Sequence, residues 1–310
     1  MNQTVRVAHG VCMSKPAGAA RLSFVKPLEP VQVETPPISN DWLHEIKYDG
    51  FRTQLVRDWA GAGAFSRNGH DWSQRYWPIV NAAEKLPAES FIVDGEMIAP
   101  DPDGRPNFHQ MHSRMVWNAE QLAFVAFDLL HLNGQDLRSL PLIERKAKLW
   151  ELVKPAKGII QYSDHVEGNG AAFFEAVEKM GLEGMVSKRR ESPYRSGKVD
   201  SWVKTKCWEV GTFELWGVKR EPGKPAVGIV ARDGKYAGSP TITLPKQLRD
   251  RLEQLVRRAR AAPPAGAPRA IVDPTVEWVK PGSITATVRH LRNEPKLRHG
   301  NVQTISEEGT

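Results

Sequence analysis

Cysteine is nearly absent from this chain of 310 residues, which contains only Cys12 and Cys207. The two stand in unrelated sequence contexts, so they predict neither a disulfide framework nor a zinc cluster. Long apolar runs are missing as well, and the N-terminus lacks the charged-then-apolar order of a secretory signal. We therefore expect a cytoplasmic protein without a membrane segment.

The glycine-rich loops that cradle phosphates in many nucleotide-binding proteins are also missing. The sequence contains no GxGxxG after a predicted strand and no GxxxxGK[ST]. If this protein uses a nucleotide, side chains rather than a glycine loop must hold it.

Excess charge is confined to the C-terminal third. Residues 1–210 contain 26 Lys and Arg against 26 Asp and Glu, whereas residues 211–310 contain 17 against 10, which accounts for the whole net charge of +7. A basic C-terminal part indicates a polyanionic partner such as nucleic acid. A basic surface that only keeps the protein soluble explains the composition equally well.

The pattern of apolar residues predicts an α+β protein of two domains. An irregular lead-in covers residues 1–22, and proline keeps the sequence irregular as far as residue 40. In the first domain, 23–210, strands and helices mix without regular βαβ alternation. Strands are expected at Phe91–Ala99, Leu122–Leu132, Ile159–Tyr162, Gly184–Lys188 and Ser201–Lys206, and helices at Trp72–Leu86, Leu142–Val153 and Ala171–Met180.

The second domain, 211–310, has a different pattern. One helical stretch is expected at Lys246–Arg260, among short strand-like runs. This combination is typical of a small β-barrel of the OB type. The runs are Phe213–Lys219, Val227–Arg232, Ala270–Trp278 and Ile284–Val288.

Lys47 is the first candidate for chemistry. It closes the apolar-flanked run Trp42–Ile46 and precedes Asp49-Gly50, a pair that predicts a hairpin between two strands. A lysine on a strand beside a tight turn can present its amine to a phosphate. Taken alone, the pattern is better explained by a surface lysine.

Five further segments follow Lys47 in order, and together they change that interpretation. They supply a guanidinium, two strand-end carboxylates, a buried aromatic ring and two lysines on one face of a strand. The segments are Ser66-Arg67-Asn68-Gly69, Asp94-Gly95-Glu96, Phe127-Asp128, Glu183-Gly184-Met185-Val186-Ser187-Lys188 and Trp202-Val203-Lys204-Thr205-Lys206.

In this order the segments resemble the motif series of the ATP-dependent DNA ligases, within the covalent nucleotidyltransferase superfamily. The sequences of residues 44–50 and 193–197 are similar to those of the ligase component of bacterial non-homologous end-joining ligases. The resemblance runs from about Ser23 to His299. It implies an adenylation (nucleotidyltransferase) domain with antiparallel sheets and flanking helices, followed by an OB-fold domain that binds DNA.

The resemblance also implies the role of each motif residue. Lys47 would attack the α-phosphate of ATP, and the AMP would pass to a DNA 5′-phosphate before a 3′-hydroxyl seals the strand. Glu96 and Glu183 would hold Mg²⁺ or Mn²⁺. The nucleotide would be bound by Glu45 at the adenine edge, Phe127 and Val186 around the ring, Arg52, Arg67 and Glu96 at ribose and phosphate, and Lys204 and Lys206 at phosphates, with Lys188 nearby.

Partners follow from the same resemblance. The substrate would be duplex DNA with nicks or ends, the protein would be a monomer located at the nucleoid when on DNA, and end-joining proteins are potential partners. DNA contacts in the second domain are expected at Arg292, Lys296 and Arg298.

Two alternatives remain open. A related RNA ligase or an mRNA-capping guanylyltransferase would share the lysine, and a DNA-binding module with a decayed lysine site would share the basic C-terminal part. Labelling with ATP against GTP, followed by nick sealing on DNA against RNA, separates the enzymes, and failure to form any AMP adduct would indicate the inactive module.

The C-terminus departs from the family pattern. Leu297-Arg298-His299 is present, but Ser306 and Gly309 stand where the resemblance places an arginine and a lysine. Because those cations would orient pyrophosphate in the first step, we expect slow self-adenylylation and comparatively normal sealing.

Overall fold

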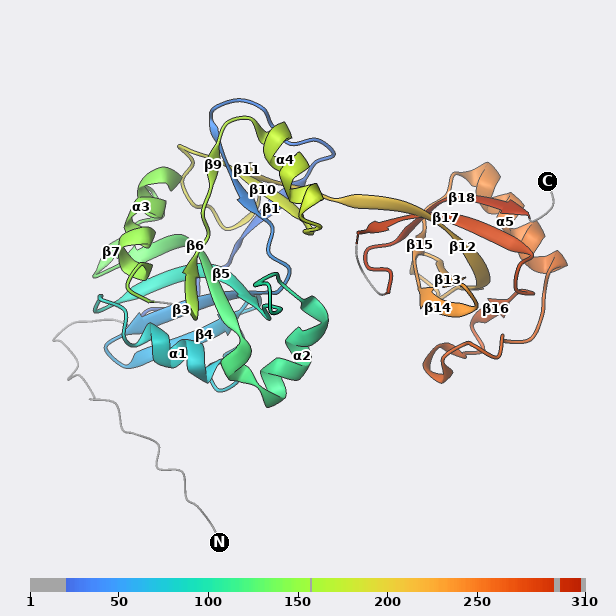
Figure 1. The fold of residues 1–310 in the computed structure, drawn as a ribbon, viewed down its shortest axis with the longest axis horizontal. Coiled ribbons are helices and arrows are strands. Elements are labelled where there is room, and N and C mark those ends of the chain that lie inside the picture. Colours follow the sequence, from blue (N-terminus) through green and yellow to red (C-terminus); the bar gives the residue numbers. More distant parts are fainter. Residues whose placement is uncertain (1–20, 157, 293–295, 308–310) are drawn as a thin grey trace, which may run out of the picture. The chain divides into compact units, whose positions relative to one another are not determined.

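The computed structural model describes residues 21–156, 158–292 and 296–307, and these form two compact units that divide between Thr205 and Lys206 (Figure 1). The boundary expected from the sequence lies between 210 and 211, inside the first long strand of the second unit. The lead-in before residue 21, Cys12 and Gly309 lie outside the described residues.

Two sheets make up the first unit, and each gathers strands from distant parts of the sequence. One sheet has the order β1 (Leu28–Gln32), β11 (Gly197–Lys206), β10 (Gly184–Arg189), β2 (Trp42–Ile46) and β9 (Val166–Glu167). The other has the order β4 (Gly61–Ser66), β3 (Phe51–Asp58), β5 (Phe91–Ile98), β6 (Ala123–Leu132) and β7 (Gln135–Asp136), with β8 (Ile160–Tyr162) parallel to β6.

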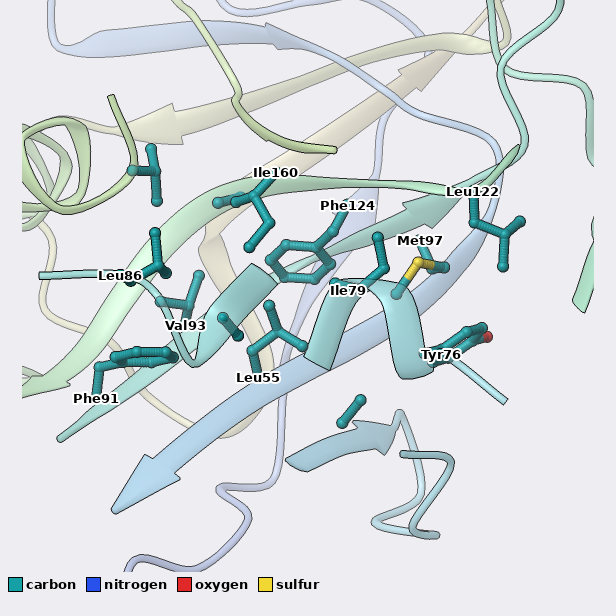
Figure 2. Packing of buried hydrophobic residues seen from close by; sticks show 14 of the residues in the cluster. Leu55, Tyr76, Ile79, Leu86, Phe91, Val93, Met97, Leu122, Phe124 and Ile160 are labelled. Carbon is teal, nitrogen blue, oxygen red and sulfur yellow. The ribbon is translucent and has the colours of Figure 1, made fainter. Parts of the chain in front are cut away.

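Successive side chains of β5 point to opposite faces of the second sheet, and the two faces pack into different cores. Phe91, Val93 and Met97 point into the main core (Figure 2), where three helices cover the sheet. Ile92 packs on the opposite face, in a smaller core shared with the first sheet. The helices are α1 (Trp77–Ala83), α2 (Phe108–Trp117) and α3 (Leu142–Val153); a fourth, α4 (Gly170–Lys179), contacts β10 and β2, and a 3₁₀ turn spans Ala119–Gln121.

The second unit is a closed barrel. Five strands form a ring in which each pairs with two others, because β12 pairs with both β13 and β17, and β15 and β18 complete the circuit. These strands are β12 (Trp208–Lys219), β13 (Val227–Arg232), β15 (Thr241–Ile242), β17 (Ile284–Leu291) and β18 (Asn301–Glu307). Two short strands, β14 (Lys235–Gly238) and β16 (Val276–Trp278), extend the sheet, a 3₁₀ turn spans Arg269–Ile271, and helix α5 (Lys246–Arg258) packs on the barrel core.

The hairpin expected at Asp49-Gly50 does not form. β2 and β3 belong to different sheets, so these residues carry the chain from one sheet to the other. A Cβ on Gly50 would lie 2.0 Å from the carbonyl oxygen of Met97, so glycine is needed for close backbone approach rather than for a turn.

Other expectations also needed correction. The region expected to be irregular up to residue 40 contains β1, which pairs in parallel with β11. The helix expected at Trp72–Leu86 is reduced to α1, which begins beside Pro78, and the strand expected at Ala270–Trp278 is reduced to β16. Helix α2 and strand β18 were not predicted, although Phe108, Met111 and Met115 recur at helical spacing in α2.

Candidate active site

A pocket opens between the two sheets of the first unit. Both sheets supply its walls, so residues far apart in the sequence meet there. Nine of the residues singled out by sequence line it: Glu45, Lys47, Arg52, Arg67, Glu96, Phe127, Val186, Lys188 and Lys204. Further lining comes from Pro27, Leu28, Glu29, Pro30, Ile46, Tyr48 and Trp202.

Lys47 follows the last residue of β2 and is held by β10. Its backbone N–H donates to the carbonyl of Gly184 at 2.9 Å, which places it next to Glu183. The Lys47 ammonium donates a hydrogen bond to the Glu183 carboxylate and remains partly exposed to the pocket. The amine therefore has a fixed position and an acceptor for a proton.

Glu45, two residues before Lys47, is buried in a network of charges. Its Oε1 lies 2.8 Å from the ammonium of Lys146 and 2.8 Å from that of Lys188, and its Oε2 accepts from the Ser163 hydroxyl at 2.6 Å. Burial alone would raise the pKa of Glu45, but the two ammonium groups outweigh it and keep this pKa below its ordinary value. The carboxylate thus stays ionised.

Lys188 occupies the same end of the pocket. Its ammonium lies 4.5 Å from the centre of the Phe127 ring and 4.2 Å from that of Trp202. Burial lowers the pKa of Lys188 to about 8, against the opposing effect of Glu45. A buried carboxylate and a buried ammonium side by side can recognise the edge of a base, because one accepts hydrogen bonds and the other donates them.

Arg52 is held rigidly on β3. Its Nε and Nη2 donate to the two oxygens of Asp94 at 2.7 Å each, and its guanidinium lies 4.6 Å from the centre of the Phe127 ring. Tyr194 donates to the same carboxylate at 2.6 Å. Since Asp94 takes only two of the five guanidinium N–H groups, others remain for a ligand.

Glu96, Arg67 and Lys204 line the pocket as well. Burial, reinforced by the nearby carboxylates of Glu183 and Asp49, raises the pKa of Glu96 to about 8, although Lys47 and Arg52 oppose this. Arg67 forms an exposed ion pair with Glu29 at 3.0 Å. Partial burial, and next the charge of Lys47, lower the pKa of Lys204.

Some predicted site residues lie elsewhere. Lys206 does not line this pocket; its ammonium lies 5.6 Å from the ring centre of Trp208, in the second unit. Arg292, Lys296 and Arg298 lie in the connection between β17 and β18 in the second unit, and Lys296 is exposed.

Sequence reasoning missed Lys146 and Ser163, the partners of Glu45. A signal for Lys146 was present. Leu142, Arg145, Lys146, Leu149, Leu152 and Val153 recur at helical spacing and are all buried, so two charged residues stand on the apolar face of α3. A charge in such a position indicates a buried partner.

Within the described residues, no group of three or more His, Cys, Asp or Glu side chains is arranged to hold a metal ion. Glu96 and Glu183 nevertheless fit a cation that also binds phosphates. Mg²⁺ commonly takes only one or two protein carboxylates, and the carboxyl groups of Glu96 and Glu183 lie close enough to interact electrostatically. No helix in the described part of the chain is long and apolar enough to cross a membrane.

Comparisons with known proteins agree on one family. The model of the family described as "ATP dependent DNA ligase domain" matches residues 29–206. The multifunctional non-homologous end joining protein LigD of Pseudomonas aeruginosa is 32% identical over 265 residues, which cover 80% of this chain and 31% of that protein. A probable DNA ligase of Streptomyces coelicolor is 35% identical over 215 residues, which cover 62% of this chain and 42% of the relative. The chain therefore spans less than half the length of these two relatives.

A solved structure is similar over most of both chains. The crystal structure of the ligase domain of M. tuberculosis LigD aligns with a TM-score of 0.56 and 27% identity, and the alignment covers 90% of this chain and 94% of the other. The similarity thus extends through both units.

Proposed function

Because the chain belongs to the family of ATP-dependent DNA ligase domains, we propose that it joins a 3′-hydroxyl to a 5′-phosphate in duplex DNA through a lysyl-AMP intermediate on Lys47. The first unit is a nucleotidyltransferase domain and the second an OB-fold domain. One observation carries the proposal. Lys47 lies in a pocket that has the buried ion pair of Glu45 and Lys188 at one end and is also lined by Arg67 and Lys204.

In the first step the Lys47 amine attacks the α-phosphorus of ATP. A phosphorus–nitrogen bond forms, the bond to the bridging oxygen breaks, and pyrophosphate leaves. The amine must first lose a proton, and Glu183 is the acceptor that it already contacts. Lys204, Arg67 and Arg52 supply positive charge where the pyrophosphate charge develops.

In the second step the oxygen of a DNA 5′-phosphate attacks the AMP phosphorus and releases Lys47. In the third step the 3′-hydroxyl attacks the DNA phosphorus, and AMP leaves. Both steps pass through the same pocket, since the AMP remains bound by the residues that held the adenine and ribose of ATP. Glu45 and Lys188 would hold the adenine edge, with Phe127 and Val186 beside the ring.

Glu96 and Glu183 are the residues that would hold Mg²⁺ or Mn²⁺. When bound, such an ion neutralises phosphate charge during nucleotidyl transfer. The names of the relatives favour a place in DNA end joining, so we include DNA ends and end-joining proteins among the proposed partners.

Incubation with ATP labelled at the α-phosphate tests the proposal. We expect a covalent AMP adduct with ATP but not with GTP, followed by sealing of a nicked DNA duplex but not of a nicked RNA duplex. Lys47→Ala and Lys47→Arg should form no adduct, because an arginine stays protonated and cannot attack. Lys85→Ala, on the exposed surface near α1, should behave as wild type. An adduct that survives Lys47→Ala would refute the assignment of the nucleophile.

A further inference from the structure

Helix α5 of the OB-fold unit and the two residues that follow it carry most of the excess positive charge of the chain. Residues 246–260 contain six basic residues against two acidic ones, so they hold +4 of the +7 found in residues 211–310. Elsewhere on this unit several cations are neutralised. Lys219 lies 2.8 Å from Glu221 and 3.5 Å from Asp273, Lys224 lies 2.6 Å from Glu221, and Arg220 pairs with Glu277.

The charges on α5 are arranged on two different faces of the helix. Lys246, Arg249 and Arg257 each have an acidic residue four positions away, Asp250 or Glu253, which is the spacing of neighbours on a helix surface. These cations are therefore partly offset by carboxylates on their own face.

On the second face, neither arginine has a carboxylate three or four positions away. Gln247, Arg251, Gln254 and Arg258 recur at intervals of four, three and four residues, so they form a line along the helix, which we call the α5 line. All four side chains are exposed, whereas Leu252, Leu255 and Val256 are buried in the barrel core. Among the described residues, no carboxylate lies within ion-pair distance of Arg251 or Arg258.

We propose that the α5 line binds phosphates of the duplex DNA that the enzyme seals. Arg251 and Arg258 are seven residues apart, which places them about 10 Å apart along the helix axis. That distance corresponds to roughly three phosphate steps along one DNA strand. Arginine and glutamine side chains are both common donors to phosphate oxygens, and a contact of this kind holds the duplex without reading its sequence.

A membrane surface is a poorer match to this helix. Membrane binding by an amphipathic helix requires its apolar face to enter the lipid, and that face of α5 is occupied by the barrel core. The assignment to DNA rests on the proposed ligase function, which supplies a polyanion as the substrate.

The experiment compares two double variants that remove the same charge from the same helix. Arg251→Gln/Arg258→Gln removes the arginines of the α5 line, and Arg249→Gln/Arg257→Gln removes two arginines from the other face. Glutamine is a good helix former, so both should fold, and thermal unfolding checks this. Binding to a nicked duplex is measured from 50 to 300 mM salt.

We expect the first variant to lower the slope of log affinity against log salt by about 1.8, and to weaken binding roughly tenfold or more at 0.1 M salt. The second should change the slope by less than half as much. Equal losses in both variants would mean that binding follows only net charge, and an unchanged slope in the first would mean that the line contacts no DNA. Either result overturns the inference.

The proposed ligase function is tested separately in the same samples. Formation of the AMP adduct should be unchanged in both variants, because none of the four arginines lines the pocket of Lys47. If the wild-type protein forms the adduct and seals nicks but the α5 line contributes nothing to DNA binding, only the proposal for the α5 line is refuted. A wild type that forms no adduct and seals nothing would refute the ligase function instead.

Discussion

Removal of Lys146 should damage both the stability of the protein and its affinity for ATP. Lys146 is fully buried, and its ammonium donates at 2.8 Å to Glu45 and at 2.8 Å to the backbone carbonyl of Ser163. In Lys146→Met the side-chain volume is nearly kept, but Glu45 retains only Lys188 as a charged partner. Breaking a buried ion pair by removing one partner costs about 3–5 kcal/mol, a large share of the free energy of unfolding of a typical domain.

The pH dependence of this loss has a defined sign. Because Lys146 helps to hold the pKa of Glu45 below its ordinary value of 4.5, the pair stabilises the fold above that pH and loses this contribution as pH falls. The destabilisation by Lys146→Met should therefore be largest near neutral pH and shrink below about pH 4.5. Urea unfolding of both proteins between pH 4 and pH 8 measures the difference.

Nucleotide binding supplies the second measurement. Single-turnover adenylylation as a function of ATP concentration should show a raised apparent Kd for ATP, with a smaller change in the maximal rate, because Lys47 and Glu183 are untouched. Discrimination against GTP should also fall. Lys148→Met, on the exposed side of the same helix, is the matched control.

A double-mutant cycle isolates the pair itself. In Glu45→Gln/Lys146→Met the two losses should not add, because either single variant already removes the attraction between Glu45 and Lys146; the loss of the Lys188 partner is common to both variants that lack Glu45. A single Lys146→Met that unfolds within 1 kcal/mol of wild type and binds ATP normally would refute the argument.

Three further predictions concern the phosphate end of the pocket and the C-terminus. Since the pKa of Glu96 is raised to about 8, the folded protein binds an extra proton at this group between pH 4.5 and 8, so in urea unfolding the stability of wild type relative to Glu96→Gln should fall over this range. Glu183→Ala should nearly abolish adenylylation and raise the Mg²⁺ concentration needed for any residual activity; full activity at limiting Mg²⁺ would show that Glu183 has no such role. Ser306→Arg should speed adduct formation without changing the sealing of pre-adenylylated nicks, as the exposed position of Ser306 on β18 allows the larger side chain; equal effects on both steps would contradict this.

The sequence alone was sufficient to identify functional residues that belong to short sequence motifs. Lys47, Glu96, Glu183 and Phe127 could be recognised because each stands in a short motif, and the motifs occur in a fixed order. The main strands and α3 could be placed from apolar periodicity, which reports a segment's own burial. The ligase family, its dependence on ATP and the two-domain α+β architecture followed from this information and agree with the comparisons.

Only the tertiary structure decided which residues become partners. Asp49-Gly50 is a hairpin signal in the sequence, but the β strands on either side of it pair with β10 and β5 instead, because sheet pairing depends on partners that are distant in the sequence. Lys188 also finds its partner through the tertiary structure: it pairs with Glu45 because β10 pairs antiparallel with β2.

Burial and long-range ion pairing also determine the free energy of each charged side chain. A sequence shows that residues 211–310 have an excess of seven positive charges, but not that Lys219 and Lys224 are paired while Arg251 and Arg258 are exposed. Lys146 stands on the apolar face of α3, but its partner is fixed only when the fold places it, fully buried, 2.8 Å from Glu45. The free energy of a charge depends on its solvation and on its nearest opposite charge, and both are properties of the folded chain rather than of the residue.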